Sequence, residues 1–309
     1  MYLRFYTLLT VVIYCGSNIK AQMPSVASGK IIRHENFKSA FVTSRHVDVW
    51  LPEGYAKDTA AYAVLYMHDG QMLFDSSHTW NHQEWGMDET GSELIRDKKV
   101  KPFIIVGIWN GGDTRHADYF PQKPFESLSD SAKASVYKAV RQNGADIFKG
   151  NRIASDGYLK FIVSELKPFI DKTYRTRTGS GGTFIAGSSM GGLISLYALC
   201  EYPKIFGGAA CISTHWPGIF QLENNPIPDA FFSYLQKKIP DPVTHKIYFD
   251  HGTATLDALY PGFQKKADVL FLKKGYNKGN FLSKIFEGAN HSEDAWKKRM
   301  SIPLEFLLQ

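Results

Sequence analysis

The chain of 309 residues has 36 basic and 30 acidic residues, a net charge of +6, and 44% of its residues are hydrophobic. This balance is typical of a globular protein and excludes a disordered or fibrous chain. No run of Lys and Arg is long enough to follow a phosphate backbone, so nucleic acid is not expected as a partner.

The amino terminus has the pattern of a secretory signal. Arg4 precedes an apolar run over residues 5–15, and small and polar residues follow, which predicts a cleaved signal peptide over residues 1–22. The run is too short to span a bilayer comfortably, so we expect a secreted or periplasmic protein without stable membrane insertion. A buried amino-terminal strand is one alternative. Lipid anchoring at Cys15 is another, although Tyr14 stands where such a signal needs a small residue.

Short apolar runs rich in β-branched and aromatic residues alternate with helical patterns along residues 23–309. Such alternation implies crossover connections and a mainly parallel sheet covered on both faces, so the sequence predicts a single three-layered α/β domain. The expected strands are Val42–Leu51, Ala63–Met67, Phe103–Trp109, Thr183–Ala186, Gly208–Ser213, Lys246–Asp250 and Leu282–Phe286. The expected helices are Glu89–Lys98, Asp156–Tyr174, Met190–Glu201, Asp229–Lys238, Gly262–Lys274 and Glu293–Leu308.

A polar stretch at about residues 121–152 interrupts this alternation. It is broken by Pro124, Gly144 and Gly150 and has a short helical pattern around Ser129–Gln142. Loops at the carboxyl ends of strands form the ligand crevice of an open α/β sheet. We therefore expect this insertion to be a lid or a substrate wall, with plain surface decoration as the alternative.

Two cysteines lie outside the predicted signal, Cys200 on an expected helix and Cys211 on an expected strand. Two cysteines do not make a disulfide framework. We expect small buried hydrophobic residues, with a single bridge as the alternative.

The strongest chemical signal is the sequence Gly-Ser-Ser-Met-Gly at residues 187–191. It matches G-x-S-x-G between an apolar strand and a helical pattern, the context in which such a motif presents a nucleophilic serine on a tight turn. Gly187 and Gly191 leave room for that turn, and the helix amino terminus favours negative charge developing near Ser189. We expect Ser189 to be the nucleophile.

A serine nucleophile needs a base, and an α/β-hydrolase sheet supplies acid and histidine after the serine in chain order. Asp257 follows the strand that ends near Asp250, and His291 follows the last expected strand. Asp250 is the competing acid, but it lies on the strand itself, whereas Asp257 lies beyond a glycine turn and could reach the imidazole. We expect Asp257 and His291 to complete a triad.

The oxyanion formed during acyl transfer needs two backbone donors. The residue after the nucleophile, Met190, supplies one N–H, and the loop after the strand Ala63–Met67 is expected to supply the second at Gln71.

His78 and His82 are four residues apart, but no His-Glu-x-x-His pattern or cysteine cluster accompanies them, so we expect solvated loop histidines and no metal site.

The sequence resembles the esterase D-like, or "putative esterase", family of α/β-hydrolases, which is related to the feruloyl and acetylxylan esterases of carbohydrate esterase family 1 and to enterochelin esterases. The resemblance implies an α/β-hydrolase fold, no cofactor, and ester hydrolysis through an acyl-enzyme on Ser189, Asp257 and His291. It covers most of the chain from about Val42 onward and is carried by Val49–Tyr55, His68–Asp75, Val106–Asn110, Arg115–Pro121, Gly187–Gly192, Gly288–His291 and Trp296.

Aromatic residues and an arginine near the expected strand ends could form a substrate pocket, because such side chains stack on a sugar or a phenolic ring. Core packing is an equally good interpretation of the Trp and Tyr residues. We expect a secreted serine esterase that hydrolyses acyl groups on carbohydrate or phenolic esters, with a small-molecule or glycan ester as its substrate. An acyltransferase and a non-catalytic binding protein on the same fold are the alternatives. The candidate pocket residues are Trp85, Arg115, Tyr119, His215 and Trp216.

Overall fold

The computed structural model describes residues 23–141 and 143–309, so the predicted signal peptide over 1–22 lies outside the described residues. Its centre is one eight-stranded sheet in the order β1-β2-β4-β3-β5-β6-β7-β8. Strands β3 to β8 run parallel to one another. Near one edge of the sheet, β2 runs antiparallel to both of its neighbours, β1 and β4. The strands are β1 (Lys30–Phe37), β2 (Arg45–Leu51), β3 (Ala63–His68), β4 (Phe103–Ile108), β5 (Thr183–Ser188), β6 (Gly208–Ile212), β7 (Lys246–Gly252) and β8 (Phe281–Phe286).

All seven predicted strands are present, and β1 is the one that sequence reasoning missed. Its sequence, KIIRHENF, is mostly polar and only partly buried because β1 is an edge strand that pairs with β2 alone. An edge strand with one solvated side lacks the continuous apolar run that identified the inner strands.

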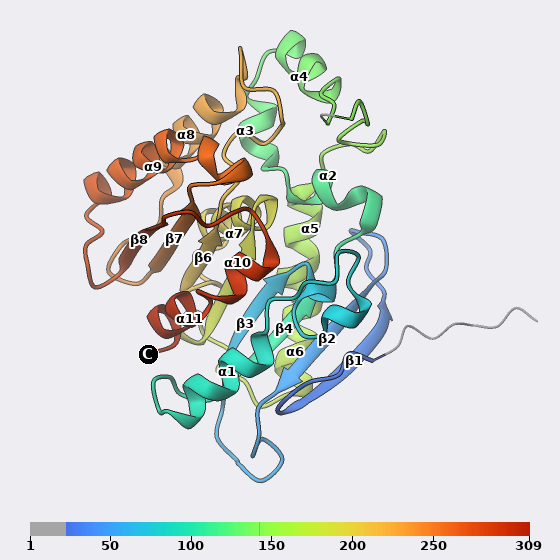
Figure 1. Ribbon diagram of the computed structural model, residues 1–309, viewed down its shortest axis with the longest axis vertical. Coiled ribbons are helices and arrows are strands. Elements are labelled where there is room, and N and C mark those ends of the chain that lie inside the picture. The colour runs from blue at the N-terminus through green and yellow to red at the C-terminus, as the bar shows by residue number, and fades with distance from the viewer. Residues whose placement is uncertain (1–22, 142) are drawn as a thin grey trace, which may run out of the picture.

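Helices cover both faces of the sheet, which confirms the predicted three layers (Figure 1). Helices α5 to α9 pack on one face and α1, α10 and α11 on the other. The α-helices are α1 (Met87–Arg96), α2 (Arg115–Tyr119), α3 (Gln122–Glu126), α4 (Asp130–Tyr137), α5 (Ser155–Phe161), α6 (Lys167–Thr173), α7 (Met190–Glu201), α8 (Ile227–Lys238), α9 (Pro261–Lys274), α10 (Glu293–Lys297) and α11 (Ser301–Leu308). A π-helical stretch joins α5 to α6 (Ile162–Leu166), and single 3₁₀ turns lie at Gly70–Met72, Ser76–His78, Gly112–Thr114, Ser180–Gly182 and Thr255–Leu259.

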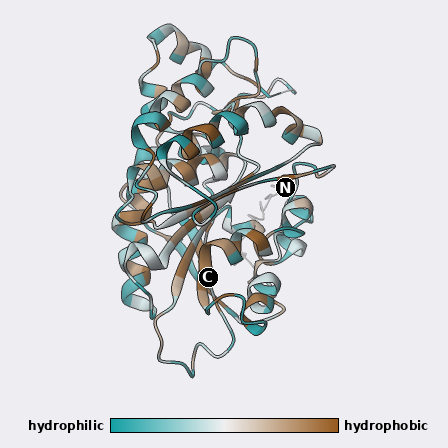
Figure 2. Ribbon diagram, turned by 90° about the vertical axis from the view of Figure 1, so that its left-hand side faces the viewer, coloured by the Kyte–Doolittle hydropathy of each residue, from teal (hydrophilic) through white to brown (hydrophobic). Residues whose placement is uncertain are grey.

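Successive strand residues point to opposite faces, and each face has its own core. In β3, Val64 and Tyr66 join the larger cluster under α5 to α9, while Leu65 and Met67 join the smaller one under α1 and α11. Figure 2 shows the apolar strands edge-on between the two helical layers.

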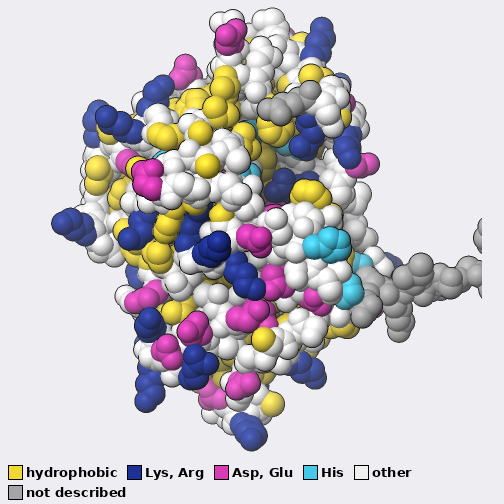
Figure 3. All heavy atoms as spheres, viewed as in Figure 1, with side chains coloured by type: hydrophobic (Ala, Val, Ile, Leu, Met, Phe, Trp, Pro, Cys, Tyr) yellow, Lys and Arg dark blue, Asp and Glu magenta, His cyan; other side chains and the backbone are white. Residues whose placement is uncertain are grey.

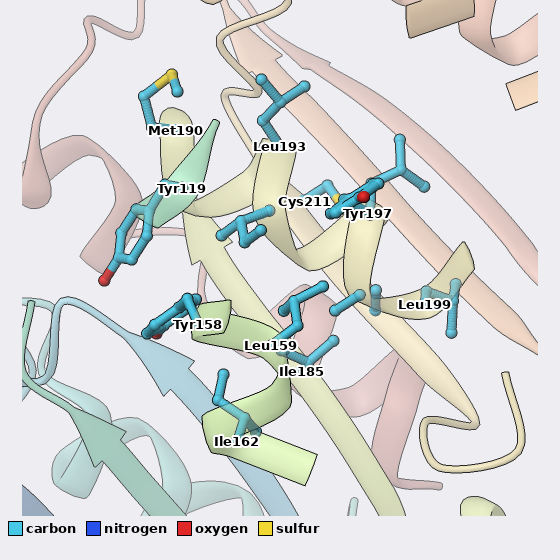
Figure 4. Close-up of a cluster of buried hydrophobic side chains, with 14 of the residues drawn as sticks. Tyr119, Tyr158, Leu159, Ile162, Ile185, Met190, Leu193, Tyr197, Leu199 and Cys211 are labelled. Atoms are coloured by element: carbon cyan, nitrogen blue, oxygen red, sulfur yellow. The ribbon is translucent and has the colours of Figure 1, made fainter. Parts of the chain in front are cut away.

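The core around α7 positions the predicted nucleophile. Every residue of α7 from Met190 to Cys200 is buried, and Figure 4 shows side chains of this helix in one cluster with Ile185 of β5 and Leu159 of α5. A helix enclosed on all sides holds its first turn rigidly.

Cys200 and Cys211 are buried and unbridged, as the preferred interpretation predicted. Burial raises the pKa of both thiols, so both stay protonated at neutral pH.

The last predicted helix, Glu293–Leu308, is two helices in the structure. It breaks after Lys297 and restarts at Ser301, which places Pro303 in the first turn of α11. A proline is tolerated there because the N–H groups of a first turn have no partner within the helix.

The insertion at about 121–152 forms α3, α4 and a short bridge between Val140 and Asp146. It stands at the top of the molecule in Figure 1, beside α2 and α8. Phe125, Val136 and Phe148 belong to the larger core cluster, so the insertion is anchored by apolar packing.

Charges of both signs intermingle on the face shown in Figure 3. Over the described parts of the chain, no helix is long and apolar enough to cross a membrane.

Candidate active site

The predicted nucleophile lies on a strained turn between β5 and α7. Ser189 has φ 57° and ψ −120°, a backbone conformation that costs free energy for any residue except glycine. The Ser189 N–H donates to the carbonyl oxygen of Ile212 (2.9 Å), and the Ser189 carbonyl accepts from the N–H of His215 (3.1 Å). The turn is therefore held by the end of β6 and by the loop after it.

The two glycines of the motif differ in how strictly they are required. A Cβ on Gly187 would lie 2.7 Å from the carbonyl carbon of Gly191, which no real contact allows. A Cβ on Gly191 would have its nearest neighbours, Asp69 and His68, at 3.5 Å, an ordinary contact. The tight turn thus requires glycine at 187, whereas the need at 191 is weaker than the sequence suggested.

The loops after β7 and β8 are joined by hydrogen bonds. The N–H groups of Thr253 and Ala254 donate to the carbonyl oxygen of Ala289 (3.1 and 3.0 Å), and the N–H of His291 donates to Oγ1 of Thr255 (2.9 Å). Any Cβ on Gly252 would collide with that same Ala289 carbonyl. This contact brings together two segments that are about 35 residues apart in the chain.

Asp257 and His291 meet across these loops. Nδ1 of His291 lies 2.5 Å from Oδ1 of Asp257, while Oδ2 accepts from the Gly252 N–H (2.6 Å) and the Ser213 hydroxyl (2.5 Å). Burial alone would raise the pKa of Asp257, but the hydrogen bonds from His291, Ser213 and Gly252 outweigh it and lower the pKa. The carboxylate is held ionised and fixed in direction.

Tyr260 brings Ser189 into the same neighbourhood. Its hydroxyl lies beside the Ser189 side chain, and its ring packs edge-on against the His291 imidazole at 5.9 Å between centroids. The structure thus gathers Ser189, His291 and Asp257 at the carboxyl ends of β5, β8 and β7.

The competing acid, Asp250, has a different partner. Arg299 holds it through Nε (3.1 Å to Oδ2) and Nη2 (2.9 Å to Oδ1), and the Tyr248 hydroxyl donates to Oδ2 (2.9 Å). Both side chains of the ion pair are buried. Asp250 is therefore occupied by Arg299, and it is Asp257 that faces His291.

Both predicted oxyanion donors lie in the first turn of a helix. Met190 is the first residue of α7, and Gln71 is the middle residue of the 3₁₀ turn Gly70–Met72. N–H groups at such positions have no acceptor within the helix and are free for an anion. A Cβ on Gly70 would lie 2.5 Å from the Gly107 carbonyl carbon, so glycine is what lets this turn pack against β4.

Arg115 lies at the rim of the site, paired with Asp69. Nε and Nη2 of Arg115 donate to the two oxygens of Asp69 (2.6 and 2.7 Å), and Asn110 adds a third bond (2.7 Å). Burial would raise the pKa of Asp69, but Arg115 and Asn110 lower it. The Arg115 side chain keeps 29% of its surface exposed, so its outer edge can meet a ligand.

The remaining candidate pocket residues are enclosed. Trp216 is 0% exposed, stacks on Phe232 and donates to Gln264 (3.1 Å), and Trp85 is 1% exposed and packs on Trp296. These contacts describe core packing, the alternative interpretation, and not a substrate surface.

Tyr119 and His215 are also buried but lie closer to the reacting groups. The Tyr119 hydroxyl accepts from the Asp69 N–H (3.3 Å), and Nδ1 of His215 bonds to the Tyr260 hydroxyl (2.9 Å). Burial lowers the pKa of His215 to about 3, which keeps its ring neutral.

Sequence reasoning did not find Ser213, Tyr260 or Arg299. The hydrogen-bond partners of each lie in distant segments of the chain. The local signals are weak: Ser213 directly follows β6, and Tyr260 lies three residues after Asp257.

His78 contacts Asp75 (3.7 Å) and is more than one third exposed. Within residues 23–141 and 143–309, no group of three or more His, Cys, Asp or Glu side chains could hold a metal ion.

The family model described as "Putative esterase" matches residues 39–301. The protein YbbA of Bacillus subtilis (strain 168) is 24% identical over 270 residues, which cover 85% of this chain and 92% of that protein. Among solved structures, a ferulic acid esterase aligns with a TM-score of 0.62 at 16% identity, covering 90% of this chain and 98% of that chain. An enterochelin esterase from Shigella flexneri has a TM-score of 0.62 at 17% identity, covering 93% and 60%. The structural likeness confirms the predicted α/β-hydrolase fold.

Proposed function

Because the chain belongs to the putative esterase family and is a carboxylic-ester hydrolase, we propose that it cleaves its substrate with a triad of Ser189, His291 and Asp257 through a covalent acyl-enzyme. The observation that carries this proposal is the convergence of three loops. They bring Ser189 and His291 to the same edge of the sheet. Ser189 lies on a strained turn, and Nδ1 of His291 lies 2.5 Å from Oδ1 of the buried Asp257.

In the first half-reaction, Asp257 keeps the proton of His291 on Nδ1, which leaves Nε2 free to accept the Ser189 hydroxyl proton. Ser189 Oγ bonds to the ester carbonyl carbon, and the carbonyl oxygen becomes an oxyanion. The N–H groups of Met190 and Gln71 are the proposed donors to it; losing one such donor typically costs about 3 kcal/mol of transition-state stabilisation. His291 then gives its proton to the departing alcohol oxygen as the C–O bond breaks.

In the second half-reaction, water replaces the alcohol. His291 takes a proton from the water as its oxygen attacks the acyl carbon, and returns that proton to Ser189 Oγ as the acyl–serine bond breaks. The carboxylic acid leaves and the free serine is restored.

We extend the proposal to esters of a carbohydrate or a phenolic acid. The ferulic acid esterase and the enterochelin esterase share the fold, and the rim of this site offers a partly exposed Arg115 that is supported from below by the buried Tyr119 ring. The exposed edge of a planar guanidinium can hydrogen-bond to or stack on a polar, ring-shaped ligand.

The insertion is proposed to be one wall of this substrate site. The Arg141 guanidinium lies 5.4 Å over the Phe220 ring, and Phe220 in turn packs on His215, the residue whose N–H braces Ser189. The insertion thereby touches the loop that borders the nucleophile.

Secretion is part of the proposal and rests on the sequence pattern of residues 1–22. Mass measurement of the exported protein should give a chain that begins at Met23; a mass that retains residues 1–22 would contradict it.

A hydrolysis panel tests the proposed function. Purified protein is assayed on acetylated xylan, methyl ferulate, and short and long nitrophenyl esters, with a sugar acceptor present in a parallel series. We expect release of free acid from at least one aromatic or acetyl ester and its loss in Ser189→Ala. Full activity of a folded Ser189→Ala variant would refute the nucleophile, and transfer to the sugar in preference to water would make the protein an acyltransferase.

A further inference from the structure

A buried serine behind the proposed triad joins two carboxylates. Ser213 follows β6 and is 0% exposed. Its hydroxyl donates to Oδ2 of Asp257 (2.5 Å), and its N–H lies 3.2 Å from Oδ1 of Asp250. The proposed mechanism assigns no role to this residue or to Arg299 and Asp250 next to it.

The direction of the Ser213 hydroxyl is fixed by its other partners. Oγ accepts from Nε1 of Trp296 (3.0 Å) and from Nη2 of Arg299 (2.9 Å). A hydroxyl has two acceptor sites and one proton. With both acceptor sites filled by N–H donors that have no acceptor function, the proton can only point to Asp257.

The backbone of Ser213 is strained. Its φ is +44°, which is uncommon for a residue with a Cβ. The N–H also bonds to the Asp250 carbonyl oxygen (2.9 Å), so main chain and side chain are both tied down. Such a conformation persists only where the surroundings over-determine it.

Charged and titratable groups surround the hydrogen bond between Ser213 and Asp257 on both sides. Behind Ser213 lie Asp250, Arg299 and Tyr248, and Nη2 of Arg299 is 4.0 Å from Oδ2 of Asp257. On the substrate side, His291 bonds to Asp257, and Tyr260 and His215 lie beyond it. Arg299 is the one cation among these groups, and Asp250 neutralises it.

We infer that Ser213 is a positioning residue for the acid of the triad, and that the Arg299–Asp250 ion pair holds its hydroxyl in the donating direction. The inference rests on the proposed function. Ser213 and the Gly252 N–H occupy Oδ2, which leaves Oδ1 as the oxygen that faces His291. A hydroxyl whose oxygen accepts from a cation donates more strongly, so the ion pair also strengthens the bond to Asp257.

Two variants test the role of the hydroxyl. Ser213→Ala removes the oxygen and keeps the strained φ, whereas Ser213→Gly removes the oxygen and relieves the strain, so it should fold even where the alanine variant does not. In both we expect kcat to fall by roughly 10- to 100-fold, the loss that a slight misplacement of a catalytic group causes.

A pH profile of kcat/KM separates positioning from simple structural support. Asp257 without the Ser213 donor is more basic and stabilises the protonated imidazole better, so the acidic limb should move to higher pH by roughly half a unit. The matched control is Thr183→Ala. Thr183 is also buried, its hydroxyl donates to the Gly179 carbonyl oxygen (3.1 Å), and it begins β5 at the end of the strand opposite Ser189. This variant should lose some stability and keep the profile unchanged.

The Ser213 variants and the Ser189→Ala variant distinguish a failure of the positioning role from a failure of the proposed esterase mechanism. If both Ser213 variants keep the wild-type kcat, or lose kcat without a shift of the acidic limb, Ser213 is not a positioning residue, while an inactive Ser189→Ala would leave the esterase mechanism standing. If Ser189→Ala keeps its activity, the mechanism itself fails.

Discussion

Two buried aspartates a few residues apart have opposite roles at the scale of single residues. Asp257 faces His291 and accepts two further donors, whereas Asp250 is fully engaged by Arg299 and Tyr248. The sequence could rank these two carboxylates by their distance from the strand end, but it could not show the arginine, which lies about 50 residues farther along. Partner identity, not position on the loop, distinguishes the two.

The Asp257→Asn variant is expected to fold and to lose kcat by about 10⁴-fold, because an amide at this position favours the wrong imidazole tautomer. Asp250→Asn should instead lower the free energy of unfolding by about 3–5 kcal/mol, since it removes the carboxylate that neutralises the buried Arg299 guanidinium. Steady-state kinetics and urea unfolding of both variants check this. A larger kcat loss in Asp250→Asn than in Asp257→Asn would reverse the assignment.

At the scale of elements, the site depends on how closely adjacent strand ends approach. The boundaries of α7 match the predicted Met190–Glu201 because the motif and the apolar run fix both ends. The contact between the loops after β7 and β8 was not predictable. It consists of backbone hydrogen bonds to the Ala289 carbonyl oxygen, and backbone groups are the same whichever amino acids occupy these positions. Gly252 is the exception: a glycine at a strand end signals close backbone approach.

Gly252→Ala should therefore separate the two loops and misplace Asp257 relative to His291. We expect kcat to fall by roughly 10²-fold with the fold retained. The matched control is Gly262→Ala in α9, where a Cβ would meet no atom within 4 Å. That change should leave kcat unaltered and raise stability by about 0.5–1 kcal/mol. Equal kcat in the two variants would show that the loop contact does not position the triad.

At the scale of the whole molecule, the sequence predicted the fold class and seven of the eight strands in the order β2 to β8. Composition was enough for β2 to β7 because these inner strands are buried along nearly their whole length. The edge strand β8 is only partly buried and was found from the alternation of strands and helices. The roles of the aromatic residues were not predictable. Trp85 and Trp216 are core residues, and only burial in the folded chain distinguishes core packing from a pocket.

Three of the five buried histidines in the described residues, His68, His116 and His215, pack against aromatic rings of the core. Burial lowers the pKa of all three, to about 3 for His68 and His215. An unfolded histidine takes up a proton below pH about 6.5, whereas the folded ones stay neutral. Their contribution to stability is therefore complete above pH 6.5 and is lost as the pH falls from 6.5 toward 3.

The free energy of unfolding should accordingly fall between pH 7 and pH 4.5, with each such histidine contributing up to about 1.4 kcal/mol per pH unit. Urea unfolding across this range measures the slope, and His68→Gln should reduce it. His82→Asn is the control, because His82 is exposed and asparagine tolerates its positive φ of 55°. A stability that stays constant from pH 7 to pH 4.5 would show that these histidines ionise freely in the folded state.

Covalent labelling shows whether Ser189 is an activated nucleophile, the property on which the proposed mechanism depends. A fluorophosphonate reacts with such a serine when Oγ attacks phosphorus and fluoride leaves, and mass spectrometry then locates the adduct. We predict one adduct per chain on the peptide that contains Ser189, formed together with loss of esterase activity and absent from Ser189→Ala and from urea-unfolded protein. Complete inactivation with Ser189 unmodified, or an unlabelled protein that still hydrolyses esters, would contradict the account.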